Sequence, residues 1–200
     1  MRIMKRQSRG KLAGKILNTI FPTRISTLAD LVLPYIENGD KVLDLGAGTG
    51  KIAEYILDRK KIKLTLLDVT DEYKETDLEI QLYDGVKVPY KSNSFDCVLI
   101  IATLHHCDDP GQVLREAARV SKDRILIKED KVDSKLDFFL LEFWHTAVSF
   151  LLGQDLLFSF KRNAVWRRMC KKLGLKLYKT QEIRSPFYKP TKQILYVLKK

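Results

Sequence analysis

The segment Val42-Leu-Asp-Leu-Gly-Ala-Gly-Thr-Gly50 joins an apolar strand, with a carboxylate near its end, to a loop that has glycine at every second position. Glycines directly after a strand let the backbone approach a nucleotide-like ligand, because the missing Cβ atoms allow tight turns and close contact. The spacing excludes the dinucleotide fingerprint G-x-G-x-x-G. Lys51 occupies its sixth place counted from Gly46, and the third glycine comes one residue early.

The pattern Asp44-x-Gly46-x-Gly48-x-Gly50 resembles the first motif of class I S-adenosylmethionine-dependent methyltransferases. Later segments resemble further motifs of that family in the same order, namely residues 64–68, 82–85, 95–101 and 104–110. The resemblance runs over residues 24–129 and is to the type 11 branch typified by ubiquinone-biosynthesis methyltransferases. It implies S-adenosylmethionine as the cofactor and a Rossmann-like fold.

Apolar periodicity predicts alternating strands and helices. We expect strands at 41–45, 62–67, 78–82, 95–102 and 124–128, and helices at 28–36, 50–59 and 110–120, the last capped by Asp108 or Asp109. This alternation predicts an α/β, doubly wound, mostly parallel sheet, with the almost continuously apolar 95–102 at its centre. After a basic helix at 164–173, strands at 175–183 and 193–198 fit the antiparallel C-terminal hairpin of the class I fold, which completes seven strands.

The length of 200 residues and the 45% hydrophobic content predict one domain with a sizeable core. We assign 1–23 to a basic N-terminal segment and 24–200 to a methyltransferase domain in which 131–165 is a lid-like insertion. The net charge of +11 is concentrated at the two ends, around an acidic middle. Such ends indicate either a positive face for an anionic partner, RNA among them, or well-solvated termini.

Three features bear on the cellular location. The three cysteines form no C-x-x-C pair, and no apolar run approaches the ~20 residues that cross a bilayer. A reducing, cytoplasmic location is therefore expected. The acid-free basic start also resembles an organellar transit peptide.

The resemblance places the cofactor beyond the carboxyl ends of the strands, at the point where the strand order reverses. It implies that the glycine loop passes under the methionine moiety, that Asp68 accepts hydrogen bonds from the ribose hydroxyls and that Asp84 accepts one from the adenine amino group. Asp68 could also be a solvated strand end, and Asp84-Gly85 an ordinary turn. The predicted cofactor-binding residues are Asp44, Gly46, Ala47, Gly48, Gly50, Asp68, Val69, Asp84, Gly85, Ala102 and His105.

Methyl transfer relies mainly on proximity and orientation, and a base is needed only for a protonated acceptor. His106 and His105 follow the central strand and titrate near neutral pH, so they are the candidate catalytic residues, with His106 preferred. Glu129 and Asp130 are secondary candidates. A histidine that only holds the loop is the alternative. We predict no metal site.

Residues 136–160 are rich in aromatic side chains and poor in charge. In similar methyltransferases this region forms part of a lid over the acceptor, and the aromatic content suits an apolar or aromatic substrate. An ordinary buried helix, or peripheral docking to a membrane or a protein partner, fits the same composition.

The sequence therefore predicts transfer of a methyl group from S-adenosylmethionine to a small, partly apolar acceptor. Two alternatives stay open: an RNA or other anionic macromolecule methyltransferase that uses the basic ends, and a non-catalytic cofactor-binding partner subunit. The sequence does not predict the acceptor or the oligomeric state.

Overall fold

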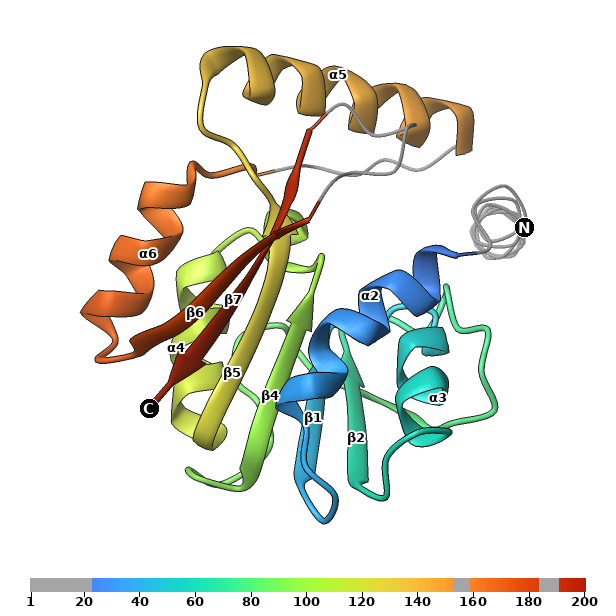
Figure 1. The fold of residues 1–200 in the computed structure, drawn as a ribbon. Coiled ribbons are helices and arrows are strands. Elements are labelled where there is room, and N and C mark those ends of the chain that lie inside the picture. Colours follow the sequence, from blue (N-terminus) through green and yellow to red (C-terminus); the bar gives the residue numbers. More distant parts are fainter. Residues whose placement is uncertain (1–22, 153–158, 184–190) are drawn as a thin grey trace.

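The computed structural model describes residues 23–152, 159–183 and 191–200 (Figure 1). Seven strands form one sheet in the order β3-β2-β1-β4-β5-β7-β6. The strands are β1 (Lys41–Leu45), β2 (Lys63–Asp68), β3 (Ile80–Leu82), β4 (Phe95–Ile101), β5 (Ser121–Asp130), β6 (Lys176–Ile183) and β7 (Gln193–Lys199). The strands β3, β2, β1, β4 and β5 pair in parallel, whereas β7 pairs antiparallel with both β5 and β6. The predicted mixed sheet with its C-terminal hairpin is confirmed.

Helices cover both faces of the sheet. They are α2 (Arg24–Val32), α3 (Lys51–Leu57), α4 (Pro110–Val120), α5 (Lys135–Leu152) and α6 (Asn163–Lys172), with short 3-10 helices η1 (Leu33–Tyr35) and η2 (Leu104–His106). Apolar side chains of α2 and α3 pack on one face of the sheet, and those of α4 and α6 pack on the other. Helix α5 crosses the edge at which the parallel strands end (Figure 1).

Local signals explain several boundaries. The 3-10 helix η1 replaces the last turn of the expected helix at 28–36, because Pro34 lies at its start and has no N–H to donate. Asp109 caps α4, as one of the two predicted caps, and its Oδ1 accepts a hydrogen bond from the Gln112 backbone N–H at 3.0 Å. Strand β5 is five residues longer than predicted: three are added at its start, where Ser121 pairs with Phe95 of β4, and two at its end, where pairing with β7 extends it to Asp130.

The strand order reverses between β1 and β4, which places a ligand crevice at the carboxyl ends of these two strands. Strands β1 and β4 are neighbours, and the chain leaves β1 toward β2 on one side and β4 toward β5 on the other. Loops that follow such a pair diverge, and ligands of open α/β sheets bind where they do. Both strands are almost wholly buried, so this position lies at the centre of the molecule.

The structure also bears on the state of the cysteines and on membrane crossing. Cys97, Cys107 and Cys170 are all free thiols. Among the described residues, no helix has both the length and the apolar content to cross a bilayer. The basic segment 1–23 lies almost entirely outside the described residues, as do residues 153–158 of the predicted insertion 131–165.

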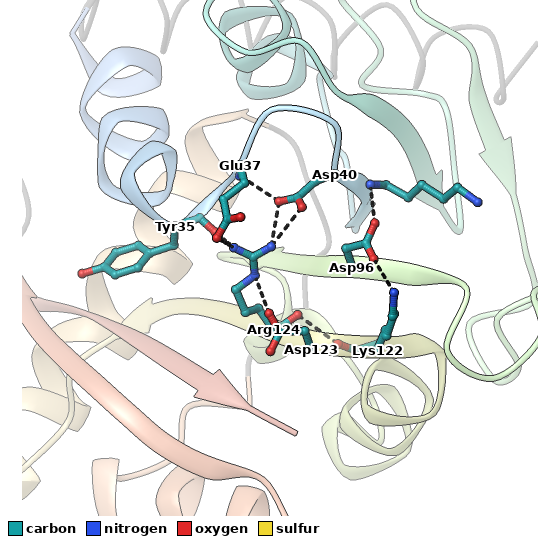
Figure 2. A network of polar contacts seen from close by, with 9 residues as sticks. Tyr35, Glu37, Asp40, Asp96, Lys122, Asp123 and Arg124 are labelled. Atoms are coloured by element: carbon teal, nitrogen blue, oxygen red, sulfur yellow. Dashed lines mark hydrogen bonds and ion pairs between the residues drawn. The ribbon is translucent and has the colours of Figure 1, made fainter.

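The amino edge of the sheet is held by an ion-pair network (Figure 2). The Nη2 group of Arg124, in β5, donates to both oxygens of the Asp40 carboxylate, at 3.0 and 2.9 Å, and its Nη1 group donates to Glu37 Oε1 at 2.8 Å. The Arg124 and Asp40 side chains are each only 10% exposed. Because Asp40 immediately precedes β1, this contact ties the start of the central strand to β5.

We expect Arg124→Met to lower the free energy of unfolding by about 3 kcal/mol, because the substitution leaves the buried Asp40 carboxylate without its cation. Urea unfolding followed by circular dichroism measures this change. Lys122→Met is the matched control, since Lys122 reaches Asp96 at 3.5 Å across an exposed surface. The control should change stability by less than about 1 kcal/mol, and equal losses in the two variants would contradict the role of Arg124.

Candidate active site

The three glycines after β1 have left-handed backbones but different surroundings. Gly46, Gly48 and Gly50 have φ angles of 86°, 55° and 75°. A Cβ at Gly46 would lie 2.3 Å from Thr103 Cγ2, and one at Gly50 would lie 2.2 Å from Thr76 Cγ2, so these two glycines allow the loop to pack. A Cβ at Gly48 would meet nothing within 4 Å. Gly48 is therefore the glycine that leaves room for a ligand.

Asp44 is a buried carboxylate in the strand that leads into this loop. Asp44 is only 3% exposed. Burial, and secondarily the negative charge of Asp68, raise the pKa of Asp44 to about 7. Within the described part of the chain, no group donates a hydrogen bond to the Asp44 carboxylate. The carboxylate is thus placed to be stabilised by a cationic ligand.

Asp68, at the end of β2, holds the glycine loop from the other side. Its Oδ2 accepts the Gly48 backbone N–H at 2.8 Å, and its Oδ1 accepts the Val69 N–H at 2.7 Å. The side chain therefore points toward the crevice and fixes the one glycine that faces open space. Contact with ribose hydroxyls stays a prediction for this carboxylate.

The segment after β3 adds an apolar surface beside Asp68. Gly85 has a φ of 76°, and a Cβ there would lie 3.2 Å from Val69 Cγ1, so these two residues are neighbours. Asp84 is exposed, and its Oδ1 accepts the backbone N–H groups of Val86 and Lys87, each at 2.9 Å. These hydrogen bonds, from Lys87 first and then Val86, hold the pKa of Asp84 below its ordinary value. Asp84 therefore forms the turn that was the alternative to its adenine role, and the adenine role itself stays a prediction.

Large apolar side chains are exposed around this turn, which is uncommon enough to need a reason. The three residues concerned are Val69, Leu82 and Val86, which are 58%, 56% and 57% exposed. A flat apolar group such as a purine would cover this surface. Sequence reasoning identified Val69 from the family resemblance but missed Leu82 and Val86, because nothing in the sequence marks them as exposed.

The chain turns sharply after β4. Ala102 has a φ of 56°, which is unusual for a residue with a Cβ, and its N–H donates to the Lys128 carbonyl at 2.8 Å. This turn brings Thr103 against Gly46 and leads into η2. Ala102 and Ala47 thus lie in the loops after β4 and β1, and their contact with the cofactor stays a prediction.

The two candidate histidines lie side by side but differ in their exposure to solvent. His105 is buried, and its Nδ1 lies 2.6 Å from Glu129 Oε2. The other oxygen of Glu129 accepts the Leu104 backbone N–H at 2.8 Å, so a single carboxylate holds η2 in place. His106 is exposed on the same turn. His105 is therefore positioned like a structural group, whereas His106 remains accessible to an acceptor. Glu129, a secondary catalytic candidate, acts in the structure as the residue that positions η2.

These features fit S-adenosylmethionine, which the sequence resemblance implies. The space over Gly48 admits a ligand close to the backbone, and the buried Asp44 carboxylate lacks a donor in the described structure. The ligand is a cation with a flat aromatic base, and the crevice offers carboxylates and exposed apolar side chains for these two parts. The described residues thus provide a matching cradle.

Comparisons with known proteins agree with this geometry. A family profile described as "Methyltransferase domain" matches residues 43–124. Methyltransferase GfsG from Streptomyces halstedii is 31% identical over 116 residues, which cover 51% of this chain and 42% of that protein. A demethylmenaquinone methyltransferase from Thermotoga maritima is 31% identical over 134 residues, which cover 59% of this chain and 58% of that protein. The chain therefore spans about half the length of these curated relatives.

Solved structures agree at the level of the fold. An S-adenosylmethionine-dependent methyltransferase from Methanosarcina mazei superposes with a TM-score of 0.68 at 14% identity, covering 85% of this chain and 96% of that chain. The sheet order, the glycine loop at the β1–β4 switch point and the matched profile all agree. Residues 43–124 thus match the methyltransferase-domain family, and the fold is that of S-adenosylmethionine-dependent methyltransferases of known structure.

Proposed function

We propose that this protein transfers a methyl group from S-adenosylmethionine to a small, partly apolar acceptor. The observation that carries the proposal is the pairing of a buried Asp44 carboxylate with open space at Gly48, at the carboxyl ends of the central strands. A carboxylate that is stripped of water and lacks a donor destabilises the protein unless a ligand uses it. The relatives named above are methyltransferases, which supports the same reading.

Each residue of the crevice has a proposed role in holding the cofactor. Asp44 attracts its positive charge, and Gly48 lets its amino-acid part lie close to the backbone. Asp68 accepts hydrogen bonds from its ribose, with Val69 and Gly85 beside its base. When bound, the sulfonium supplies an activated methyl group and a good leaving group.

The protein's own contribution is orientation and proton handling. Methyl transfer is an in-line displacement, so the residues that align the acceptor supply most of the rate enhancement. We assign proton removal from the acceptor to His106, because it is the exposed histidine of η2. His105, held by Glu129, keeps that turn in position.

The region above the crevice supports the proposed acceptor class. Helix α5 lies across the carboxyl edge and carries aromatic side chains, which suits a partly apolar molecule (Figure 1). We propose that α5 is the central part of the lid-like insertion 131–165. The demethylmenaquinone methyltransferase among the relatives is named for an acceptor of this general class.

Methyl-labelled S-adenosylmethionine and fractionated cell extract test this function. We expect label to appear in a small-molecule fraction that partitions into organic solvent, and His106→Gln to reduce its rate by roughly 100-fold while leaving cofactor affinity unchanged. Label found in RNA would instead support the second reading below. Cofactor binding without transfer to any fraction would favour a non-catalytic subunit.

Gly48→Val should abolish measurable binding of S-adenosylmethionine in calorimetric titration, because its side chain fills the space a ligand needs. Gly39→Val is the matched control. Gly39 also has a left-handed backbone, with φ of 93° and nothing within 4 Å of its added Cβ, but it lies at the amino end of β1. Both variants should lose about 1–2 kcal/mol of stability from backbone strain. Retained affinity in Gly48→Val, or equal loss of affinity in the Gly39 control, would exclude a ligand at Gly48.

Cofactor affinity should rise with pH through about 7, because Asp44 must lose its proton to attract a cation and burial raises its pKa to about 7. Above that pH the affinity should be level. Asp44→Asn should bind more weakly at high pH and show no rise in this window. Titrations of both proteins across the range check this, and an unchanged pH profile in the variant would assign the effect to another group.

The same variant provides a stability readout. Since folding raises the pKa of Asp44 from 3.8, its ionised form destabilises the folded state at pH values above about 7. Asp44→Asn should therefore be more stable than the wild type there, by an amount on the order of a few kcal/mol, and the difference should vanish as pH falls below 3.8. A gain in stability together with a loss of binding identifies a ligand site and excludes general unfolding.

A second function is suggested by three basic residues at a mainly apolar groove between α6 and the C-terminal hairpin. Its cavity of 450 Å³ is lined by Arg167, Lys171 and Lys176, together with apolar side chains of β6 and β7. These three basic side chains are the groups that would contact the phosphates of an anionic macromolecule such as RNA. Binding that weakens steeply with added salt would support this function over the small-molecule acceptor.

A further inference from the structure

The chain contains three histidines, and the structure brings all of them together. The His105 and His106 ring centroids are 4.1 Å apart, and the His105 and His145 centroids are 5.4 Å apart. His145 comes from α5, whereas the other two come from η2. Helix α5 is therefore joined to the turn after β4 through side chains that can bind a metal.

His105, Asp130 and His145 each offer one ligand atom, and these atoms lie within 4.8 Å of one another. His145 Nε2 is 3.3 Å from Asp130 Oδ2, which is close to the distance between two ligand atoms that bind the same small metal ion. His105 and Asp130 are 2% and 3% exposed. Two imidazoles and one carboxylate, supplied by three different elements, form a donor set typical of zinc and related divalent transition metals.

Glu129 provides the outer contact that such sites usually contain. A histidine that binds a metal commonly donates its other ring N–H to a carboxylate, which fixes the orientation of the ring. Glu129 Oε2 lies 2.6 Å from His105 Nδ1, and Glu129 is itself held by the Leu104 N–H. This arrangement would direct His105 Nε2 to the metal.

The surroundings also suit a divalent cation. Phe160 stacks on the His105 ring at 5.3 Å and meets the His145 ring edge-on at 4.9 Å, so an apolar wall limits access by water. Two consecutive carboxylates, Glu129 and Asp130, are buried here, with 1% and 3% exposure. A bound divalent cation would offset their negative charges.

We propose that His105, Asp130 and His145 form a Zn²⁺-type site that fastens α5 to the carboxyl end of β5 and to η2. The site goes beyond the proposed methyl transfer and replaces the sequence-based expectation that the chain has no metal site. Three protein ligands leave one position of a tetrahedron for water or for a heteroatom of a bound molecule. The nitrogen ligands select against Mg²⁺ and Ca²⁺, which prefer oxygen.

The test uses the full chain without an affinity tag, stripped of metal with a chelator and titrated near neutral pH. We expect one equivalent of Zn²⁺ or Co²⁺ to bind with micromolar or tighter affinity, and Mg²⁺ not to bind. Co²⁺ should give the visible absorption of a four- or five-coordinate site. Zn²⁺ at 100 times its dissociation constant should raise the midpoint of thermal unfolding by about 5 °C.

Near-isosteric variants assign the ligands. Asp130→Asn and His145→Gln should each weaken Zn²⁺ binding by at least about tenfold, and Glu129→Gln by about 10- to 100-fold. His106→Gln and Cys107→Ser are the controls, because they remove a neighbouring imidazole and a neighbouring thiol that are not in the group of three. Both controls should bind Zn²⁺ as the wild type does.

Three results would overturn the proposal: no Zn²⁺ binding by wild-type protein with a native circular dichroism spectrum, unchanged affinity in both ligand variants, or an equal loss in either control. Cofactor affinity, measured on the same metal-free samples, keeps the outcome separate from that of the proposed function. Loss of metal binding with cofactor binding intact concerns only this site.

Discussion

The parallel pairing of β1 with β4 is the constraint on which the candidate site depends. Val42, Leu43 and Asp44 lie opposite Cys97, Val98 and Leu99, in the middle of a sheet that helices cover on both faces. A strand in this position cannot expose a polar side chain to water before its end. Asp44, the next-to-last residue of β1, therefore stays buried, and the loops that follow β1 and β4 must separate directly above it.

The burial of Asp44 lowers stability at the carboxyl edge of the sheet, and contacts at the amino edge offset this loss. The crevice combines a desolvated carboxylate at Asp44 with a left-handed backbone at Ala102, a residue that has a Cβ. Features of this kind persist only where the surrounding structure enforces them. At the opposite edge, Arg124 binds Asp40 and Glu37 with good geometry (Figure 2). The stable amino edge holds β1 in register, so the carboxyl edge can keep the strained groups that binding requires.

The sequence was sufficient for the fold because the fold depends on local patterns. Strand β1 has the predicted bounds, Asp109 caps α4 as one of the two predicted residues, and β6 and β7 lie within one residue of the predicted strands 175–183 and 193–198. The family resemblance located the glycine loop and Asp68. Contacts between distant segments carry no such local signal. Nothing in the sequence shows that Arg124 meets Asp40, that His105 is buried while His106 is exposed, or that His145 of α5 reaches Asp130.

The end of β5 links the two halves of the site. Glu129 holds the backbone of η2 and the side chain of its histidine, His105. Asp130, the next residue of β5, contacts His145 of α5. The backbones of these two acidic residues pair with Ile194 and Gln193 of β7, which fixes their position. The groups proposed for the cofactor come from β1, β2 and the loops after β1, β2 and β3. An in-line displacement requires the acceptor to approach from the side opposite the leaving group. We therefore propose that η2, α5 and the end of β5 recognise the acceptor.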